Sequence, residues 1–418
     1  MQHKHFFASG NTQCGFVDLF SSNLQGIEKI FILKGGPGTG KSTLIKKVAK
    51  VCEEEGLDAE ILHCSSDPDS LDGIIIPALS VAVVDGTQPH VIEPTAPGAI
   101  EEYVNLGKAW DSGYLKTQKD TILEIKAQIK TCFDNAYEFL NKAHLAYEEW
   151  KKYYTKNTKF DKVNKICENL INSILKDISL DKAGKIKRRF SFSQTPKGVM
   201  DYIHTILNTV SKRYYLKGRP GTGKSTILAK LYENALQRGL DMEVYYNGLN
   251  ADKIHMILFP ELDLIVFDST LPHEFETIDG EDEVIDIFKE CVKPNVETKH
   301  QREIQGICAQ YNIWLNKSIR QLENAKKLHD QLENIYVNSI NFNVIDEITG
   351  EILDYVKNKI EKQNNINSDI AQAADDNEIE NTEDTTQTCG ETTEPKDEIE
   401  KNYEEFYGNI NTDQDSTF

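Results

Sequence analysis

Apolar and polar positions follow the same order in the two halves of this chain. A short apolar run predicts a buried strand over Ile30–Leu33 in the first half and over Tyr214–Leu216 in the second. A helix is expected next, over Ser42–Glu55 and Ser225–Gln237, and in both halves a glycine follows its last residue as a helix-ending signal. Each half therefore begins with a strand, a glycine-rich loop and a helix.

Two more strands are expected after that helix in each half. The second strand covers Ala59–His63 or Met242–Tyr246, and a polar loop follows it. The third covers Ser80–Val84 or Leu262–Phe267 and leads into an aspartate. Strands that alternate with helices are typical of the α/β class, so we expect parallel sheets.

Beyond each predicted core, apolar residues recur every three or four positions. These stripes run from Ile122 to Trp150 and from Ile304 to Ile335, and they predict long amphipathic helices. Two interpretations stay open, packing of the helices on each other or on the sheets, and a role as arms that bind a protein partner.

An internal duplication explains why the pattern occurs twice. Shifting the sequence by 183 residues aligns Phe7–Ile92 with Phe190–Phe275 without a gap, and about a third of the positions are identical. The sequence therefore predicts two tandem domains, 1–183 and 184–362, followed by a tail, 363–418. Their cores are expected at about 5–110 and 188–293, and their helical parts at about 111–180 and 296–362.

Charge is concentrated at the C-terminal end. The formal net charge is -20, but 16 acidic and 2 basic residues lie from Gln363 onward, so the rest of the chain carries only -6. This tail has few aromatic residues and is expected to be disordered, with a basic partner or a solubility role left open. The basic segment 181–189 is interpreted as a linker or a strand edge, and a nucleic-acid contact is not supported.

The cysteines and the apolar segments bear on location. The eight cysteines are scattered without a CxxC pair, which is typical of free thiols in a reducing compartment. The first residues lack the apolar stretch of a signal peptide. The longest apolar run, Gly73–Val84, contains Pro77 and is shorter than the roughly 20 residues that cross a bilayer. We expect a cytoplasmic protein that is not inserted in a membrane.

Two glycine-rich loops give the strongest functional signal. The first glycine loop, 35–42, reads Gly-Gly-Pro-Gly-Thr-Gly-Lys-Ser, and the second glycine loop, 218–225, reads Gly-Arg-Pro-Gly-Thr-Gly-Lys-Ser. Both fit the phosphate-binding P-loop pattern, in which backbone N–H groups and the start of a helix surround a phosphate. The expected nucleotide-binding residues are Gly35, Gly36, Pro37, Gly38, Thr39, Gly40, Lys41, Ser42, Thr43, Gly218, Arg219, Pro220, Gly221, Thr222, Gly223, Lys224, Ser225 and Thr226.

Catalytic and metal-binding residues are expected around these loops. Lysine contacts the β- and γ-phosphates of a bound nucleotide, while a serine hydroxyl and a strand-ending aspartate hold Mg²⁺. The expected metal-binding residues are Ser42, Asp85, Ser225 and Asp268, and the expected catalytic residues are Lys41, Lys224, Asp85, Asp268, His90 and His273. For His90 and His273, in the repeated Asp-[Gly/Ser]-Thr-x-Pro-His, a phosphate-sensing role and a structural turn both stay open.

The residues that could promote hydrolysis differ from those of many ATPases. Gly86 and Ser269 follow the strand-ending aspartates, where such enzymes place a glutamate base. Asp67, Asp69 and Asp72 are alternative bases in the first half, and a turn or helix-cap role is open for them too. The first 187 residues contain no arginine, whereas Arg219 lies within the second glycine loop. We therefore expect the two sites to differ in catalytic ability.

The chain resembles the P-loop NTPase superfamily and, over residues 1–340, a bacterial family of tandem P-loop ATP-binding proteins. The resemblance rests on the duplicated Gly-x-Pro-Gly-Thr-Gly-Lys-Ser-Thr, on His-Cys-Ser-Ser-Asp-Pro-Asp-Ser-Leu-Asp-Gly at 63–73, and on Asp-Gly-Thr-x-Pro-His at 85–90. It implies binding of ATP with Mg²⁺ and ATPase activity, so an ATPase or an ATP-dependent switch is the leading hypothesis.

Three other functions are alternatives to that hypothesis. A kinase for a nucleotide or small molecule is the first alternative, although the first half has no arginine-rich lid. A scaffold that binds nucleotide without hydrolysis is the second. A GTPase is the third, because Thr158-Lys-Phe-Asp161 fits the guanine-reading pattern [NT]-K-x-D. That match follows a charged helix instead of a strand and is absent from the second half, so chance is the better explanation.

Overall fold

The fold is taken from a computed structural model of the chain, which describes residues 2–270, 275–277 and 282–383. Its contacts divide the chain into two units, Met1–Glu361 and Lys362–Phe418. The first unit contains both glycine loops.

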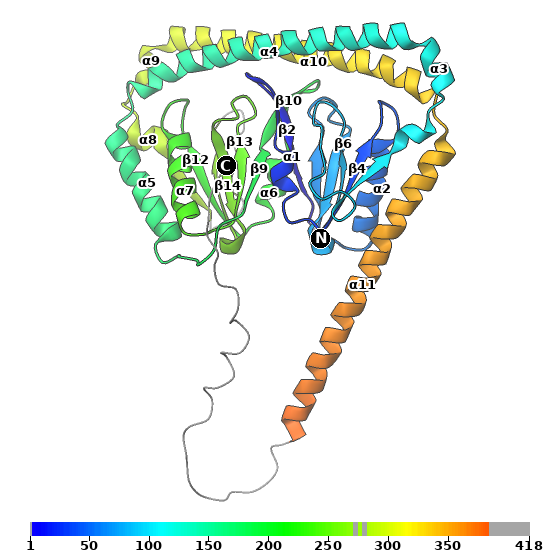
Figure 1. Ribbon diagram of the computed structural model, residues 1–418. Helices are drawn as coiled ribbons and strands as arrows, with labels where there is room; N and C mark the ends of the chain where they lie inside the picture. Colours follow the sequence, from blue (N-terminus) through cyan, green and yellow to red (C-terminus); the bar gives the residue numbers. More distant parts are fainter. Residues whose placement is uncertain (1, 271–274, 278–281, 384–418) are drawn as a thin grey trace, which may run out of the picture. The chain divides into compact units, whose positions relative to one another are not determined.

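Two six-stranded sheets form the centre of the first unit in the described residues (Figure 1). The order in the first sheet is β1 (Lys4–Phe6), β5 (Glu60–His63), β6 (Leu71–Ile76), β7 (Val81–Asp85), β4 (Lys29–Lys34) and β8 (Glu101–Asn105). The order in the second sheet is β9 (Ile186–Phe190), β13 (Met242–Tyr246), β14 (Ile254–Phe259), β15 (Leu264–Asp268), β12 (Lys212–Lys217) and β16 (Glu283–Asp286). The same order in both confirms that the halves share one α/β plan.

The expectation of wholly parallel sheets was wrong at one strand in each half. β6 and β14 run antiparallel to both of their neighbours, whereas the other pairings in each sheet are parallel. A 3₁₀ turn that begins at a proline, Pro77–Leu79 or Pro260–Leu262, joins each of these strands to the next. Ser80 and Asp263 then take left-handed backbone angles, φ 52° and 48°, which reverse the chain within a few residues.

Smaller elements connect the strands in matching positions. Hairpins β2–β3 (Ser9–Thr12 and Gly15–Asp18) and β10–β11 (Phe192–Thr195 and Gly198–Asp201) precede the short helices α1 (Phe20–Asn23) and α6 (Ile203–Leu207). The helices that follow the glycine loops are α2 (Lys41–Glu54) and α7 (Lys224–Gln237). After the last strand of each sheet come η2 (Leu106–Ala109) and α3 (Ser112–Thr117) in the first half, and α8 (Ile287–Cys291) and α9 (Val296–Lys299) in the second.

Two long helices lie side by side across one end of both sheets (Figure 1). They are α4 (Lys119–Thr155) and α10 (Gln301–Val337), and they run in opposite directions. Ile122 packs near Leu332 at one end, and Tyr154 packs near Ile304 at the other. The expectation that the amphipathic helices pack on each other is thus confirmed.

The next helix in each half crosses to the sheet of the other half. α5 (Phe160–Leu175) comes from the first half in sequence, yet its Leu170 and Ile174 share a core with Leu231 of α7 and Val266 of β15. α11 (Phe342–Glu383) comes from the second half, and its residues up to 360 pack on the first sheet and α2. Each sheet is therefore covered on one face by its own glycine-loop helix and by a helix from the opposite half (Figure 1).

The two halves share a third core between the sheets. Ile32 and Val84 of the first sheet belong to the same buried cluster as Tyr215 and Phe267 of the second. Phe7 and its repeat equivalent, Phe190, bridge each other, with Phe190 N donating to Phe7 O over 2.9 Å. Equivalent residues of the two halves therefore contact each other, and the two sheets share one buried cluster.

A buried ion cluster ties the halves together at this junction. The Arg189 guanidinium is 0% exposed and donates to Glu60 over 2.7 Å, to Glu243 over 2.9 Å and to Asn23 over 2.9 Å. Burial favours neutral carboxyls, but Arg189 outweighs it, and the pKa of Glu243 is lowered to about 2. Residues 186–189 of the basic segment belong to the edge strand β9, while 181–185 form the irregular chain before it, and Arg189 is buried.

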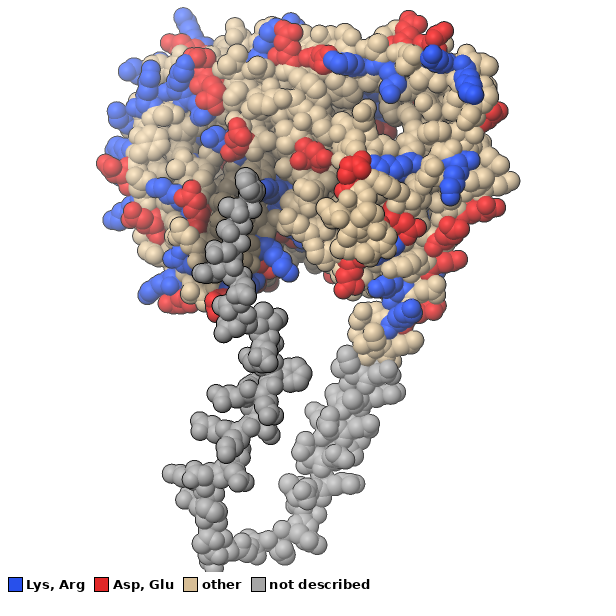
Figure 2. Space-filling view, viewed as in Figure 1, with Lys and Arg blue, Asp and Glu red and all other residues tan. Residues whose placement is uncertain are grey.

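Three further observations concern the tail and the surface. The segment 363–383, expected to be disordered, belongs to α11, because extending an existing helix requires no new nucleation; residues 384–418 lie outside the described residues. Among the described helices, none is long and apolar enough to cross a membrane. On the face drawn in Figure 2, basic and acidic side chains are interspersed.

Candidate functional site

The first glycine loop links β4 to α2 and folds around its own lysine. Lys41 Nζ donates to the carbonyl oxygens of Gly35 over 3.1 Å and Gly36 over 2.8 Å. Gly38 and Gly40 have φ of +69° and +82°, where a side chain would strain the backbone. A Cβ on Gly35 would lie 2.6 Å from Thr39 Oγ1. The glycines at these positions are therefore required by the loop's own geometry.

The second glycine loop, between β12 and α7, repeats this arrangement. Lys224 Nζ donates to Arg219 O over 2.9 Å, and Gly221 and Gly223 have φ of +80° and +104°. Lys224 is buried, and burial lowers the pKa of its ammonium, although Asp268 opposes that effect. Two loops of the same backbone form thus lie at the carboxyl ends of the equivalent strands.

Each lysine lies close to the aspartate at the end of the neighbouring parallel strand. The distance between Lys41 Nζ and Asp85 Oδ2 is 3.6 Å, and that between Lys224 Nζ and Asp268 Oδ2 is 3.7 Å. Thr87 donates from N and Oγ1 to Asp85 Oδ1 over 2.9 and 2.6 Å. The parallel pairing of β4 with β7, and of β12 with β15, places each glycine loop and its aspartate at the same edge of the sheet.

The oxygen atoms near these lysines fit a magnesium ion. Asp268 Oδ1 is buried and has no hydrogen-bond partner within the described residues, and carboxylate and hydroxyl oxygens are ligands that Mg²⁺ favours. Ser42 Oγ accepts from Leu71 N over 3.0 Å, which holds the hydroxyl at the start of α2. Ser225 occupies the same position at the start of α7. Ser42 with Asp85, and Ser225 with Asp268, therefore stay the candidate ligands for Mg²⁺ at the two loops.

His90 is buried against Asp72 and Phe20 and does not project into solvent. Its Nε2 lies 3.4 Å from Asp72 Oδ2, and its ring lies 5.1 Å from that of Phe20. Burial disfavours the imidazolium, but Asp72 outweighs this effect, with Asp85 and Asp18 adding to it, and the pKa of His90 is raised to about 9. His273, its repeat equivalent, lies outside the described residues.

The raised pKa of His90 predicts a pH-dependent contribution to stability. A folded pKa above the ordinary value of 6.5 stabilises the fold fully below pH 6.5, and that stabilisation is lost as pH rises through about 9. His90→Gln should therefore lower the unfolding free energy by up to about 3 kcal/mol more at pH 6 than at pH 10. Chemical denaturation of both proteins across this range measures the difference, and the same loss at every pH would contradict the assignment.

The alternative bases in the first half are each engaged in other contacts. Asp69 is exposed and pairs with Lys197 of β10–β11 over 2.6 Å. Asp67 lies 3.4 Å from Lys326 of α10 and accepts from Ser70 Oγ. Asp72 faces His90 and follows Leu71, whose N–H holds Ser42. Of these three carboxylates, Asp72 is the one whose neighbour in the sequence, Leu71, donates a hydrogen bond to the first loop at Ser42.

The two glycine loops differ in the arginines that they contain. Arg219 Nε donates to Glu297 over 2.7 Å, and its guanidinium lies 4.8 Å from the centre of the Phe288 ring. Arg189 and Arg238 instead hold parts of the fold together, Arg238 by donating to Leu175 O over 3.2 Å. At the position that corresponds to Arg219, the first loop has Gly36, over which the Tyr336 ring lies.

Helix ends from the opposite half cover both loops, which sequence reasoning missed. A Cβ on Gly221 would lie 2.4 Å from Thr155 Oγ1, and this hydroxyl donates to Gly221 O over 3.2 Å. A Cβ on Gly223 would lie 2.9 Å from Val163 and 3.7 Å from the Phe160 ring. The match Thr158-Lys-Phe-Asp161, interpreted as chance, therefore lies beside the second glycine loop. Its position could not be recognised because it belongs to the first half in sequence.

The first loop is covered in the same way by the end of α10 and the start of α11. A Cβ on Gly38 would lie 2.8 Å from Val337 and 2.9 Å from Glu333, and one on Gly40 would lie 3.3 Å from Ile345. His329, Asp330 and Glu333 place ligand atoms within 4.8 Å of one another here. The Lys326 ammonium pairs with Asp330 and lies near Asp67, so a protein cation already neutralises part of the negative charge of this cluster.

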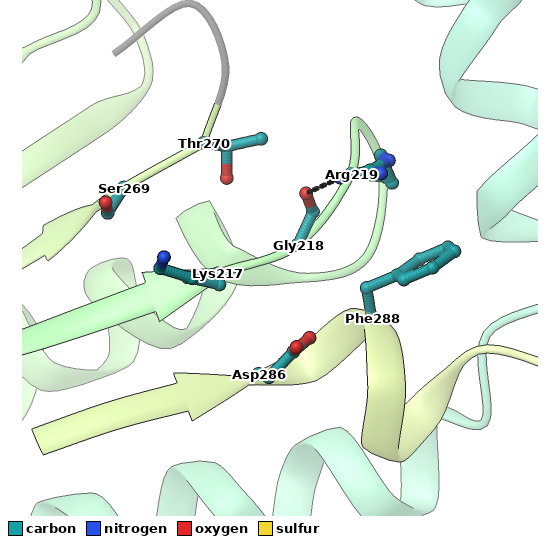
Figure 3. Close-up of a pocket in the computed structure, with 7 residues that line it drawn as sticks. All are labelled: Lys217, Gly218, Arg219, Ser269, Thr270, Asp286 and Phe288. Atoms are coloured by element: carbon teal, nitrogen blue, oxygen red, sulfur yellow. Dashed lines mark hydrogen bonds between the residues drawn. The ribbon is translucent and has the colours of Figure 1, made fainter. Parts of the chain in front are cut away.

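A pocket opens beside the second loop (Figure 3). Its lining residues are Lys217, Gly218, Arg219, Ser269, Thr270, Asp286 and Phe288. They come from the carboxyl ends of β12, β15 and β16, the edge at which open α/β sheets bind ligands. The pocket and the glycine loop therefore share one end of the sheet.

Comparison of the chain with protein-family models, with curated proteins and with solved structures gives no match.

Proposed function

We propose that this chain binds nucleoside triphosphate with Mg²⁺ at both glycine loops and works as an ATPase or an ATP-dependent switch. One observation carries the proposal. The same constellation occurs twice, a glycine loop between a buried strand and a helix, with its lysine Nζ 3.6 or 3.7 Å from an aspartate on the adjacent strand. Repetition of the whole arrangement at equivalent positions argues against a chance motif.

The roles of the residues follow from their chemistry. Lys41 and Lys224 would hold the β- and γ-phosphates, and backbone N–H groups at the starts of α2 and α7 would add to that positive environment. Ser42 with Asp85, and Ser225 with Asp268, would hold Mg²⁺. The bound ion would supply positive charge against the phosphate oxygens. Asp72 faces His90 and follows Leu71, whose N–H donates to Ser42, so this pair would be the candidate to orient a water in the first site.

Contacts between the halves support a switch. Gly221 of the second loop accepts a hydrogen bond from Thr155 at the end of α4, and Gly38 of the first loop lies against Val337 at the end of α10. If a bound phosphate moves the backbone of either loop, it would also move Thr155 or Val337, which contact that loop. Because α4 and α10 pack along their length, a shift at one end is carried toward the other loop.

The cysteines support the location that the sequence favours. The seven cysteines within the described residues are free thiols, which supports a reducing, cytoplasmic compartment as part of this proposal.

Phosphate release tests the enzymatic part of the proposal. ATP and GTP are offered with Mg²⁺ to the wild type, Lys41→Ala, Lys224→Ala and the double variant, with and without small-molecule acceptors. We expect turnover without an acceptor, loss of it in the double variant, and unequal losses in the single variants because the loops differ at Gly36 and Arg219. Turnover that requires an acceptor would identify a kinase instead, and tight binding without turnover would identify a non-hydrolysing switch or scaffold.

A further inference from the structure

Two histidines of the first half share a hydrogen bond where the halves meet. His5 Nδ1 lies 2.8 Å from His63 Nε2, so one ring nitrogen donates its proton and the other accepts it. The His63 ring stacks on Tyr202 of the second half, with centroids 3.9 Å apart, and His5 N donates to Thr205 Oγ1 over 3.1 Å. This histidine pair therefore joins strands β1 and β5 of the first sheet to the start of α6.

His63 also lies directly beside the residue that holds Ser42. The antiparallel pairing of β5 with β6 places His63 opposite Leu71, and Cys64 N donates to Ser70 O over 3.1 Å just beyond that pair. Leu71 N in turn donates to Ser42 Oγ over 3.0 Å. A displacement of His63 would therefore move Leu71 and, with it, the serine hydroxyl that is a candidate ligand for Mg²⁺.

The second half has the same strands but a different pair of side chains at these positions. Tyr246 is the repeat equivalent of His63, and it lies opposite Ile254 in the same register. Arg188 is the repeat equivalent of His5. Burial raises the pKa of the Tyr246 hydroxyl, with Arg188 opposing that effect, and a guanidinium stays charged at any ordinary pH. The second half therefore has no histidine at either position, and its pair keeps the same charge between about pH 5 and pH 8.

The surroundings of the histidine pair favour its neutral form. Burial lowers the pKa of His5, and it lowers the pKa of His63 to about 4, with neighbouring histidines adding to the effect on each ring. A folded pKa below the ordinary 6.5 stabilises this contact fully above pH 6.5, and that stabilisation is lost as pH falls toward 4. The titratable and charged groups around the pair are His3, Lys46, Glu53, Asp72 and His204, and those around the covering Tyr202 ring are Asp69 and Asp201.

We propose that His5 and His63 form an acid-sensitive link between the halves that positions Ser42, so that nucleotide binding at the first site, unlike the second, depends on this pair staying neutral. When both rings are protonated, each facing nitrogen carries a hydrogen, so the shared hydrogen bond cannot form and two cations face each other. His63 then separates from His5 and Tyr202, and Leu71 no longer holds the serine in place. The effect on nucleotide rests on the proposed function, whereas the opening of the link does not.

Hydrogen exchange of the full chain without nucleotide tests the opening. It is measured at about pH 7.5 and about pH 5.5, on either side of the ordinary histidine pKa, and corrected for the intrinsic exchange rates. An opening that protonates one or both histidines should become about 10- to 100-fold more favourable over this interval. Protection of the Leu71 amide should fall by that factor, whereas protection of the Ile254 amide, its repeat equivalent, should change by less than about threefold.

Three variants identify the groups responsible. His5→Arg combined with His63→Tyr copies the pair of the second half, and His63→Gln supplies a polar side chain that cannot become charged, so both should abolish the loss of protection at Leu71. His204→Gln removes a nearby exposed histidine and should leave the loss as in the wild type. Equal protection of Leu71 at both pH values in the wild type, or an undiminished loss in His63→Gln, would overturn the proposed link.

Nucleotide affinity tests whether the link positions Ser42. The Mg²⁺ complex of a non-hydrolysable ATP analogue is titrated at the same two pH values into the Lys224→Ala chain, which leaves the first site, and into the Lys41→Ala chain, which leaves the second. The first site should lose more affinity on acidification than the second, by up to about 10- to 100-fold, and His63→Gln should remove the difference. Equal losses at the two sites would overturn the positioning of Ser42. Absence of binding to either chain at both pH values would instead refute the proposed function, and the exchange measurement would still decide whether the link opens.

Discussion

Replacing Arg189 with alanine is expected to lower the free energy of unfolding by about 3–5 kcal/mol, because the buried carboxylates of Glu60 and Glu243 would lose their one fully buried cation and keep only the partly exposed Lys4 and Lys187. The effect should exceed that of any single exposed ion pair in the chain, since exposed pairs contribute about 0–1 kcal/mol. Chemical denaturation followed by circular dichroism measures the change.

The neighbouring residue provides the control for this prediction. Arg188 lies in the same strand but is exposed, so Arg188→Ala should change stability by no more than about 0.5 kcal/mol. Equal effects of the two substitutions would show that the buried cluster does not hold the halves together.

The second large effect is expected from Leu170→Ala, a substitution in α5. Leu170 is 3% exposed and packs in the core of the second sheet, so its truncation should destabilise the fold by about 2–5 kcal/mol. Hydrogen exchange should rise in β12, β15 and α7, which belong to the other half in sequence. Ile352→Ala, also 3% exposed, should raise exchange in β4, β7 and α2 instead.

Exchange confined to the substituted residue's own half would contradict the reciprocal docking of α5 and α11. Leu145→Ala, which removes a side chain that is 59% exposed on α4, serves as the control and should leave both patterns unchanged.

Local patterns in the sequence predicted the elements around the loops well. The predicted strand Met242–Tyr246 is β13 to the residue, and the predicted helix Ser225–Gln237 differs from α7 by one residue. These elements are specified by nearby signals, an apolar run and a glycine at each end. The strand β6 was not predicted, because Leu71–Ile76 follows a run of turn residues and ends at Pro77, a setting that is typical of a loop.

Long-range packing could not be predicted in the same way. The amphipathic stripe of α5 shows that one face is buried, but the same face would suit the first sheet as well as the second. Only the length and direction of α4, which spans from one sheet to the other, decides the choice. Arg189 is a second example, because its neighbours in the sequence are basic and exposed, while its partners Glu60 and Glu243 are far away along the chain.

These long-range contacts also explain why the site was only partly predicted. The residues of the glycine loops and the aspartates Asp85 and Asp268 could be predicted because each lies within one local motif. Thr155, Phe160 and Val337 were not, because each adjoins a glycine loop that lies in the other half of the sequence.

Counting bound nucleotides tests the central claim most directly. Native mass spectrometry of the full chain with Mg²⁺, ATP and GTP resolves how many nucleotides each molecule holds. We predict two for the wild type, one for Lys41→Ala, one for Lys224→Ala and none for the double variant. A wild type that binds none, or a double variant that still binds two, would contradict nucleotide binding at the glycine loops.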